Sequence, residues 1–441
     1  MPSVGRIEDT YMQTPISFIH PRDEILHTIE RIYRYGMTTI SGGNVSMRDD
    51  NGDIWITPSQ VDKGGLRRED IVCVRRDGAA EGCHPPSSEL PFHREIYQAR
   101  PDIRAIVHAH PPALVAFSLI REVPNTHLLP QANLVCRGVG FAGYELPGSL
   151  ALGRSLAATF RQGYDCVILE NHGVAIGGGN LTEAFCRFET LEFVCKTIVR
   201  ATALGTVRYL SEEQLHLPLH HLRHLPDFPC EPPSSAEKEL RRQLAEFVRR
   251  AYHQRLFIST EGSFSARLDE NSFLITPHRG DRGMLDARDF VLVREGKSEA
   301  GKPASWAAGV HEAIYRQHPG VGAVINAYPV HATSFGVTDA VLDTRTIPES
   351  YVVLRHVGRI AYGMQFVDSE AVARYLSPNQ PVALLENEGA LITGASVLEA
   401  YNRLEVLEST AEALFNARAI GTMAPMSDDT IRELEKSHLH S

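Results

Sequence analysis

The feature that most constrains this chain is an internal repeat. The segment AIVHAHPPALVAF at residues 105–117 recurs as AVINAYPVHATSF at 323–335, an offset of 218 residues. The segment HREIY at 93–97 recurs as HEAIY, ITP at 56–58 recurs at 275–277, and ENHG at 170–173 recurs as ENEG at 386–389. Blocks matching in the same order at nearly constant offset mark two copies of one structural unit. The sequence therefore predicts one domain present twice.

The repeat and the proline content together suggest domain boundaries. We place the first copy at 21–210 and the second at 236–425. The intervening segment 211–235 is rich in proline and histidine, which is typical of a linker or an irregular surface segment. Residues 1–20 then form an N-terminal extension and 426–441 a C-terminal tail.

Local patterns within each copy favour an α/β fold. Pro21 begins a stretch whose apolar residues recur at helical spacing, and Gly36 is placed to end that helix. Residues 105–110 form a short apolar run that two prolines stop, which is typical of a strand. A second helix is expected after the linker, with Ser234 or Ser235 as its N-cap. Helices and strands joined by short connections indicate layered α/β domains.

Composition excludes several classes of function. The 441 residues carry a formal net charge of -10 without a cluster of basic residues, which argues against a nucleic-acid partner. No apolar run approaches the ~18 residues of a membrane span, and the N-terminus lacks the pattern of a secretory signal. We therefore expect a cytoplasmic protein that binds no membrane. Its 7 cysteines lack C-x-x-C spacing and are expected to be reduced thiols.

Three histidines are candidate metal ligands. His108 and His110 lie two residues apart on a predicted strand, so their side chains project from the same face. His172 stands where another strand gives way to a glycine turn. A catalytic zinc takes three protein ligands and keeps a fourth position open. Taken alone, a His-x-His pair also fits ordinary core or surface histidines.

A serine pair and a glutamate stand at the predicted start of the helix that follows Glu89. Ser87 or Ser88 suits the N-cap, and the free N–H groups of a helix N-terminus can bind an anion such as phosphate. A plain N-cap with a favourable glutamate is the structural alternative. Glu89 precedes His108 by 19 residues, so a helix and a turn can return its carboxylate beside the strand as a general acid or base.

Two short loops could also contact a phosphate. The string SGGNVS at residues 41–46 offers backbone N–H groups, and Thr57 begins the triplet TPS. Either string could equally be only a turn between elements.

Taken in order, these motifs resemble the class II aldolase/adducin family, closely over residues ~21–205 and in outline over ~236–420. The matching residues are Gly43, Asn44, Ser46, Thr57, Pro58, Ser59, Ser87, Ser88, Glu89, His108, Ala109, His110, Asn171, His172 and Gly173. The resemblance implies two tandem three-layer α/β/α domains of the class II aldolase type. Each would have a central mixed, mainly antiparallel sheet.

The resemblance also implies roles. His108, His110 and His172 would bind zinc, and Glu89 would be the catalytic acid/base. Gly43, Asn44, Thr57, Ser87 and Ser88 would bind the substrate, a small phosphorylated or acidic sugar derivative. Zinc would act as a Lewis acid that stabilises an enediolate during carbon–carbon cleavage. The family also contains decarboxylases, dehydratases and epimerases that keep the metal, and adducin is a non-catalytic interaction protein, so these remain alternatives.

The second copy lacks this chemistry. At the repeat offsets His108 becomes Asn326, His110 becomes Tyr328, His172 becomes Glu388 and Glu89 becomes Ala307. We therefore expect one Zn²⁺ per chain, in the first domain only, and a second domain that does not catalyse by this mechanism.

One departure from the family concerns a tyrosine. In the aldolases a tyrosine of a neighbouring subunit donates a proton, but residues 128–134 contain none. The second copy has Tyr351 at the position of Asn133. Family members are commonly fourfold-symmetric tetramers, so a homodimer of tandem chains would imitate that ring. Tyr351 would then be a catalytic residue supplied by the degenerate domain, although an ordinary packing role is the alternative.

Overall fold

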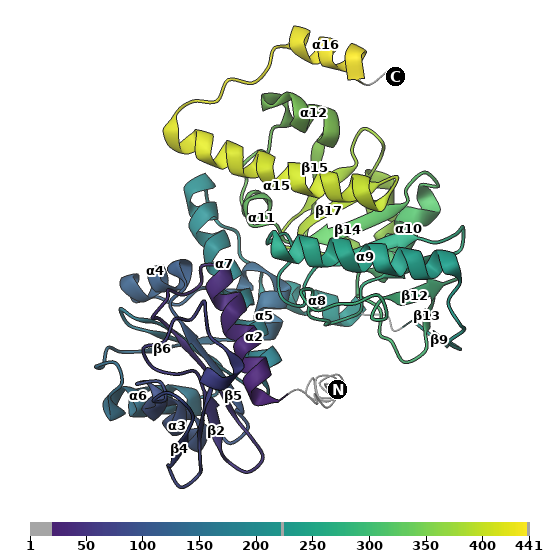
Figure 1. Cartoon of the computed structure of the whole chain (residues 1–441). Coiled ribbons are helices and arrows are strands. Elements are labelled where there is room, and N and C mark those ends of the chain that lie inside the picture. The colour runs from purple at the N-terminus through teal and green to yellow at the C-terminus, as the bar shows by residue number, and fades with distance from the viewer. Residues whose placement is uncertain (1–19, 222–224, 439–441) are drawn as a thin grey trace. The chain divides into compact units, whose positions relative to one another are not determined.

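The computed structural model describes residues 20–221 and 225–438. Figure 1 shows these elements, coloured from purple at the N-terminus to yellow at the C-terminus. The chain divides into two compact units. One contains the residues up to Val115 together with Ala142–Gly163 and Leu169–Ala184. The other contains Ala116–Phe141, Tyr164–Ile168 and the residues from Phe185 onward, so part of the first repeat copy clusters with the second.

The first copy is built on an 8-stranded sheet with the order β4-β3-β2-β1-β5-β8-β7-β6. Neighbours from β4 to β8 in this order pair antiparallel. The strands are β1 (Asn44–Arg48), β2 (Ile54–Ile56), β3 (Val72–Val74), β4 (Ala80–Glu81), β5 (Ala105–Ala109), β6 (Val139–Ala142), β7 (Cys166–Leu169) and β8 (Gly173–Gly178).

The second copy is built on a 9-stranded sheet with the order β15-β16-β17-β14-β10-β11-β12-β13-β9. The pairs β15–β16 and β13–β9 are parallel, and the other neighbours are antiparallel. The predicted mixed, mainly antiparallel sheet is thereby confirmed. The strands are β9 (Asp227–Phe228), β10 (Ser263–Arg267), β11 (Ser272–Ile275), β12 (Val291–Arg294), β13 (Lys297–Glu299), β14 (Ala323–Ala327), β15 (Val357–Ile360), β16 (Val382–Leu385) and β17 (Gly389–Gly394).

The strand registers confirm the repeat at the level of single residues. His108 pairs with Asn44 on one side and Ala175 on the other. Its counterpart Asn326 pairs with Ser263 and Leu391 in the same way. The offsets read from the sequence are therefore the offsets of the folded chain.

The helices of the first copy include one that the sequence predicted. Helix α2 packs on β1 and β2 and ends before Gly36. Ile25, Ile29 and Ile32 are buried in it, whereas Tyr33 is 37% exposed. Helix α3 packs against α6. The helices are α2 (Pro21–Arg34), α3 (Leu90–Ala99), α4 (Pro112–Ile120), α5 (Pro130–Cys136), α6 (Leu150–Arg161) and α7 (Leu181–Leu204), with short 3-10 turns η1 (Arg68–Asp70) and η2 (Thr126–Leu128).

In the second copy, helices cover both faces of the sheet. Helices α9 and α15 contact β10, β14 and β17. The opposite face carries an apolar cluster that includes α10 and α14 and the strand residue Val324. Successive residues of a strand point to opposite faces of the sheet, so alternate residues pack against the helices on each face. The helices are α9 (Ser235–His253), α10 (Ala308–Gln317), α11 (Val330–Gly336), α12 (Pro348–Leu354), α13 (Met364–Val367), α14 (Ser369–Tyr375) and α15 (Val397–Ile420), with η3 (Thr344–Thr346).

The segments between and after the copies are partly ordered. Residues 211–235, expected to be an irregular linker, contain α8 (Glu212–His221) and β9, which pairs with β13 at the edge of the second sheet. Ser234 caps α9 by accepting the Glu237 N–H, as predicted. The C-terminal tail contains α16 (Asp428–His438). The N-terminal extension up to residue 19 lies outside the described residues.

Two expectations from composition can be checked here. All 7 cysteines are free thiols, 5 of them buried. Within the described ranges, no helix combines the length and the apolar character that crossing a membrane requires.

Candidate metal centre

The strand β5 and the turn before β8 bring three histidines together in the first compact unit. His108 lies on β5, and His110 follows directly after its last residue. His172 lies in the turn after Asn171, whose φ of 53° gives the chain its sharp change of direction. One ligand atom from each histidine lies within 4.8 Å of the others. The structure thus brings all three predicted ligands into one group.

The surrounding backbone leaves little freedom at this group. A Cβ on Gly173 would lie 2.5 Å from the Ala109 carbonyl and 2.6 Å from the His110 ring. Gly43 has a φ of +71°, and its Cβ would lie 2.8 Å from the His108 carbonyl. The glycines of the sequence motifs therefore allow the close approach of the strands that carry the histidines.

Hydrogen bonding fixes which nitrogen of His108 faces the group. Its Nδ1 lies 2.9 Å from the Val174 carbonyl, which can only accept, so Nδ1 carries the proton. Its Nε2 is therefore the nitrogen that faces the group. Burial lowers the pKa of His110 to about 3 and that of His172 to about 4. At neutral pH these imidazoles are uncharged, which is the form that binds metals.

The donor set fits a zinc ion. The Nε2 atoms of His108 and His110 are 3.1 Å apart. Tetrahedral zinc with Zn–N bonds of 2.0–2.1 Å places its nitrogens about 3.3 Å apart. The His108 Nε2 also lies 3.0 Å from the carboxylate oxygen Oε2 of Glu89. A positive ion at this point would satisfy both groups.

Glu89 lies at the N-cap position of α3, so the prediction that Ser87 or Ser88 is the N-cap was wrong. Ser87 instead turns back and its Oγ accepts the Glu89 N–H. The Glu89 carboxylate lies 3.6 Å from Nε2 of His172 as well as beside His108. Burial would raise the pKa of Glu89, but His108, His172 and a hydrogen bond from Asn44 hold it well below its ordinary value. Glu89 is therefore an ionised, buried base.

Asn44 holds Glu89 through a polar chain that the sequence did not reveal. Its Nδ2 donates to Oε2 of Glu89 at 2.8 Å, and its Oδ1 accepts from His93. Ser46 Oγ lies 2.7 Å from both His93 Nδ1 and the Tyr97 hydroxyl. The second copy keeps this arrangement: Ser265 bonds to His311 and Tyr315. This series of polar contacts is therefore part of the fold that the two copies share. Its only signal in the sequence was the repeat of H-x-x-x-Y at 93–97 and 311–315.

The other predicted substrate residues occupy different depths. Thr57 is fully buried and its hydroxyl accepts the Val45 N–H, while Ser87 is 8% exposed and Ser88 is open to solvent. Sequence reasoning missed Lys63, which is 2% exposed and donates to the Pro58 carbonyl at 2.7 Å. A cation is thus placed beneath the TPS turn.

The residues of the second copy lie in the corresponding places, within the second compact unit. Ala307 is the N-cap of α10, as Glu89 is of α3. Asn326, Tyr328 and Glu388 are all at least nine-tenths buried. Tyr351 lies on α12, where its hydroxyl donates to Glu435 of α16 at 2.7 Å.

Known proteins resemble the chain in the same two regions. The family model described as Class II Aldolase and Adducin N-terminal domain matches residues 23–199 and 242–415. An L-fuculose phosphate aldolase of Methanococcus maripaludis is 37% identical over 157 residues, 35% of this chain and 83% of that protein. A 3-oxo-tetronate 4-phosphate decarboxylase of Haemophilus influenzae is 31% identical over 188 residues, 42% of this chain and 88% of that protein.

A second aldolase and a solved structure extend the comparison. A 5-deoxy-D-ribulose 1-phosphate aldolase of Bacillus thuringiensis is 33% identical over 202 residues, 44% of this chain and 91% of that protein. The structure of an L-fuculose 1-phosphate aldolase aligns with a TM-score of 0.41 and 31% identity, covering 45% of this chain and 93% of that one. The two matches of the family model together cover the greater part of the chain. This protein therefore belongs to the class II aldolase and adducin family and carries its domain in tandem.

Proposed function

We propose that the first copy is a zinc-dependent carbon–carbon lyase that acts on a small phosphorylated or acidic sugar derivative. The observation that carries this proposal is the convergence of three histidine side chains beside a buried carboxylate. His108, His110 and His172 would hold the metal, one ion per chain. When bound, zinc supplies a Lewis acid for the carbonyl and hydroxyl oxygens of the substrate.

Glu89 is suited to move the proton. Asn44 fixes its Oε2, whereas its Oε1 has no hydrogen-bond partner among the described residues. A buried carboxylate with one oxygen held and the other free can accept a proton from a substrate hydroxyl and return it to carbon. Glu89 would therefore act as base and then as acid in the cleavage.

The remaining loop residues would hold the substrate. The turn at Gly43 and Asn44, the Thr57 turn and the start of α3 with Ser87 and Ser88 come from separate loops of the first copy. The exposed Ser88 suits a phosphate or a carboxylate, whereas the Thr57 hydroxyl is buried and already accepts the Val45 N–H. The names of the aldolase relatives, which are all sugar phosphate aldolases, support the same class of substrate.

A decarboxylase is the second candidate. The relative from Haemophilus influenzae is named for decarboxylation of a 3-oxo-tetronate 4-phosphate, and its similarity extends over 188 residues. Both reactions break a carbon–carbon bond next to a carbonyl group, so the proposed site could serve either one.

The experiment that tests the proposal combines metal analysis with a substrate screen. The full chain is assayed on ketose phosphates and on oxidised sugar acid phosphates, beside the variant Glu89→Gln. The variant should keep its metal and its fold but lose turnover on the order of 10²-fold or more, because an amide cannot accept the proton. Glu170→Gln, the same change outside the site, is the control. If Glu89→Gln lost its metal while folded, Glu89 would be a ligand and its proposed role would be wrong.

A further inference from the structure

The second copy has a polar cluster at the place that corresponds to the metal centre. We call it the second-copy cluster, and it consists of Glu261, Tyr328, Glu388 and Gln131. Tyr328 and Glu388 replace His110 and His172, and Glu261 replaces Gly42. Gln131 comes from α5, in the sequence of the first copy, and belongs to the same compact unit as Glu388. A helix of the first copy thus reaches the altered site of the second.

The hydrogen bonds at Glu388 distinguish its two oxygens. Its Oε2 accepts the Gln131 Nε2 at 3.0 Å and the Tyr328 hydroxyl at 3.3 Å. The Gln365 side chain also lies close to this carboxyl and lowers its pKa, but Oε1 of Glu388 makes no hydrogen bond of normal geometry among the described residues, and the same is true of Oε1 of Gln131. Oε1 of Glu388 and Oε1 of Gln131 are therefore both unpaired acceptors, although the two side chains already share one hydrogen bond.

These two oxygens can pair if a proton lies between them. A carboxylic acid and a primary amide form a cyclic pair in which the amide N–H donates to one carboxyl oxygen and the acid O–H donates to the amide oxygen. We propose that Glu388 is a neutral carboxylic acid and that, with the Gln131 carboxamide, it forms such a pair. The residues of the second copy that correspond to the metal site would then bind helix α5.

The surroundings of Glu388 favour its neutral form. It is 3% exposed, and burial together with the nearby Glu261 raises its pKa to about 7. The hydroxyls of Tyr328 and Tyr362 also face it, and burial raises the pKa of both. Two arginines lie near Glu261, Arg282 and Arg279, and Arg282 donates to the carbonyls of Gly262, Gly280 and Pro277.

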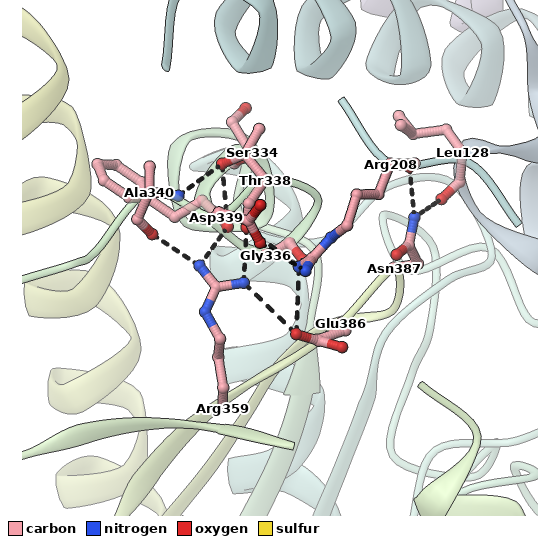
Figure 2. Close-up of polar contacts among 11 residues, drawn as sticks. Leu128, Arg208, Ser334, Gly336, Thr338, Asp339, Ala340, Arg359, Glu386 and Asn387 are labelled. Carbon is pink, nitrogen blue, oxygen red and sulfur yellow. Dashed lines mark hydrogen bonds and ion pairs between the residues drawn. The ribbon is translucent and has the colours of Figure 1, made fainter. Parts of the chain in front are cut away.

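The residues next to Glu388 bind the same parts of the first copy. Asn387 donates to the carbonyls of Leu128 and Arg208 at 2.9 Å each. Glu386 accepts from Arg208 at 3.1 Å, with Arg359 at 3.7 Å. Figure 2 shows these contacts around the turn that holds Glu386 and Asn387. Three consecutive residues of the turn therefore contact Leu128, which precedes α5, Gln131 within α5, and Arg208, which follows α7. Of the three, only Glu388 would need a proton for the contact that we propose.

The pH dependence of stability follows from the raised pKa. A carboxyl whose folded pKa is about 7 and whose unfolded pKa is about 4.5 stabilises the fold fully below pH ~4.5. Between these two pKa values this group lowers the folding equilibrium constant about tenfold for each unit by which the pH rises, and its contribution is lost above pH ~7.

The experiment compares the full chain with Glu388→Gln, which is uncharged at every pH, by urea unfolding from pH 5 to 8. The stability of the wild type relative to this variant should fall as the pH rises and level off above pH ~7. Glu386→Gln makes the same chemical change two residues away and should keep the wild-type slope. A difference between wild type and Glu388→Gln that does not change with pH would overturn the proposal.

A second measurement covers the case in which Glu388→Gln does not fold. Infrared spectroscopy of the wild type should show a protonated carboxyl band at pH 6 that disappears by pH 8. Calcium or magnesium chloride should not raise the unfolding temperature. If either salt stabilised the wild type but not Gln131→Leu, a cation and not a proton would join the two oxygens, and the proposal would be wrong.

Discussion

The two copies have similar backbone conformations but carry different side chains at the positions of the metal centre. Asn171 and Asn387 have φ values of 53° and 54°, so the turn that bears His172 in one copy bears Glu388 in the other. The sequence was sufficient to predict that the three histidines and Glu89 lie together, because their motifs and spacing resemble those of a known family. It was not sufficient for Ser46 or Lys63, because buried polar residues of these types carry no spacing that identifies their partners.

Removal of one imidazole should remove the metal. The full chain should bind about one equivalent of zinc, and His108→Ala should bind none tightly, because two imidazoles leave zinc with too few protein ligands. Metal analysis after dialysis against a weak chelator measures this directly. His331→Ala, a change at a buried histidine of the second copy, should keep the metal. Two tightly bound equivalents in the wild type, or a retained equivalent in His108→Ala, would refute the assignment.

Among the elements, those with a local signal were predicted best. Helix α2 begins at a proline and buries a helical stripe, and α9 begins with a serine cap, so both could be located from neighbouring residues. Strand β9 could not, because its 2 residues are ordered by pairing with β13, far away in the sequence. The start of α3 at Leu90 was predicted correctly, but its N-cap residue is Glu89, which makes no side-chain cap hydrogen bond, and not Ser87 or Ser88.

The close pairing of strands β5 and β8 leaves no space for a side chain at Gly173. In Gly173→Ala the new Cβ would meet the Ala109 carbonyl and the His110 ring, and backbone in a paired strand cannot move aside. We expect a loss of roughly 1–3 kcal/mol from overpacking and weaker zinc binding. Thermal unfolding and competition with a chromogenic chelator measure the two effects. Gly205→Ala, which meets no atom within 4 Å, should change neither, and equal behaviour of the two variants would contradict this account.

At the scale of the whole molecule, α5 and α12 are equivalent helices with different partners. Both follow a 3-10 turn and end at an arginine with a φ of 54° or 58°, which supports the alignment of Asn133 with Tyr351. Helix α5 binds the second-copy cluster, whereas α12 contacts α16. We propose that in a homodimer α12 faces the metal centre of the other chain and supplies Tyr351.

The tyrosine is tested by removing its hydroxyl alone. Tyr351→Phe should lower turnover by roughly 10²–10⁴-fold if a proton from its phenol limits the rate, with metal content and dimer mass unchanged. Light scattering gives the mass and steady-state kinetics give the turnover. Glu435→Leu removes the acceptor of the same hydroxyl and should leave most of the activity. Full activity in Tyr351→Phe would assign Tyr351 to packing against α16.

The glutamate at the position of Gly42 makes the divergence of the second copy hard to reverse. A Cβ on Gly42 would lie 3.0 Å from Nδ1 of His110, so Glu261 occupies space that a histidine at position 328 would need. Restoring the three histidines one codon at a time would gain nothing until Glu261 had also become glycine. Meanwhile each step that altered Glu388 would disturb its contact with Gln131. Conversion of the second copy into a metal site would therefore require a change at Glu261 as well as at Asn326, Tyr328 and Glu388.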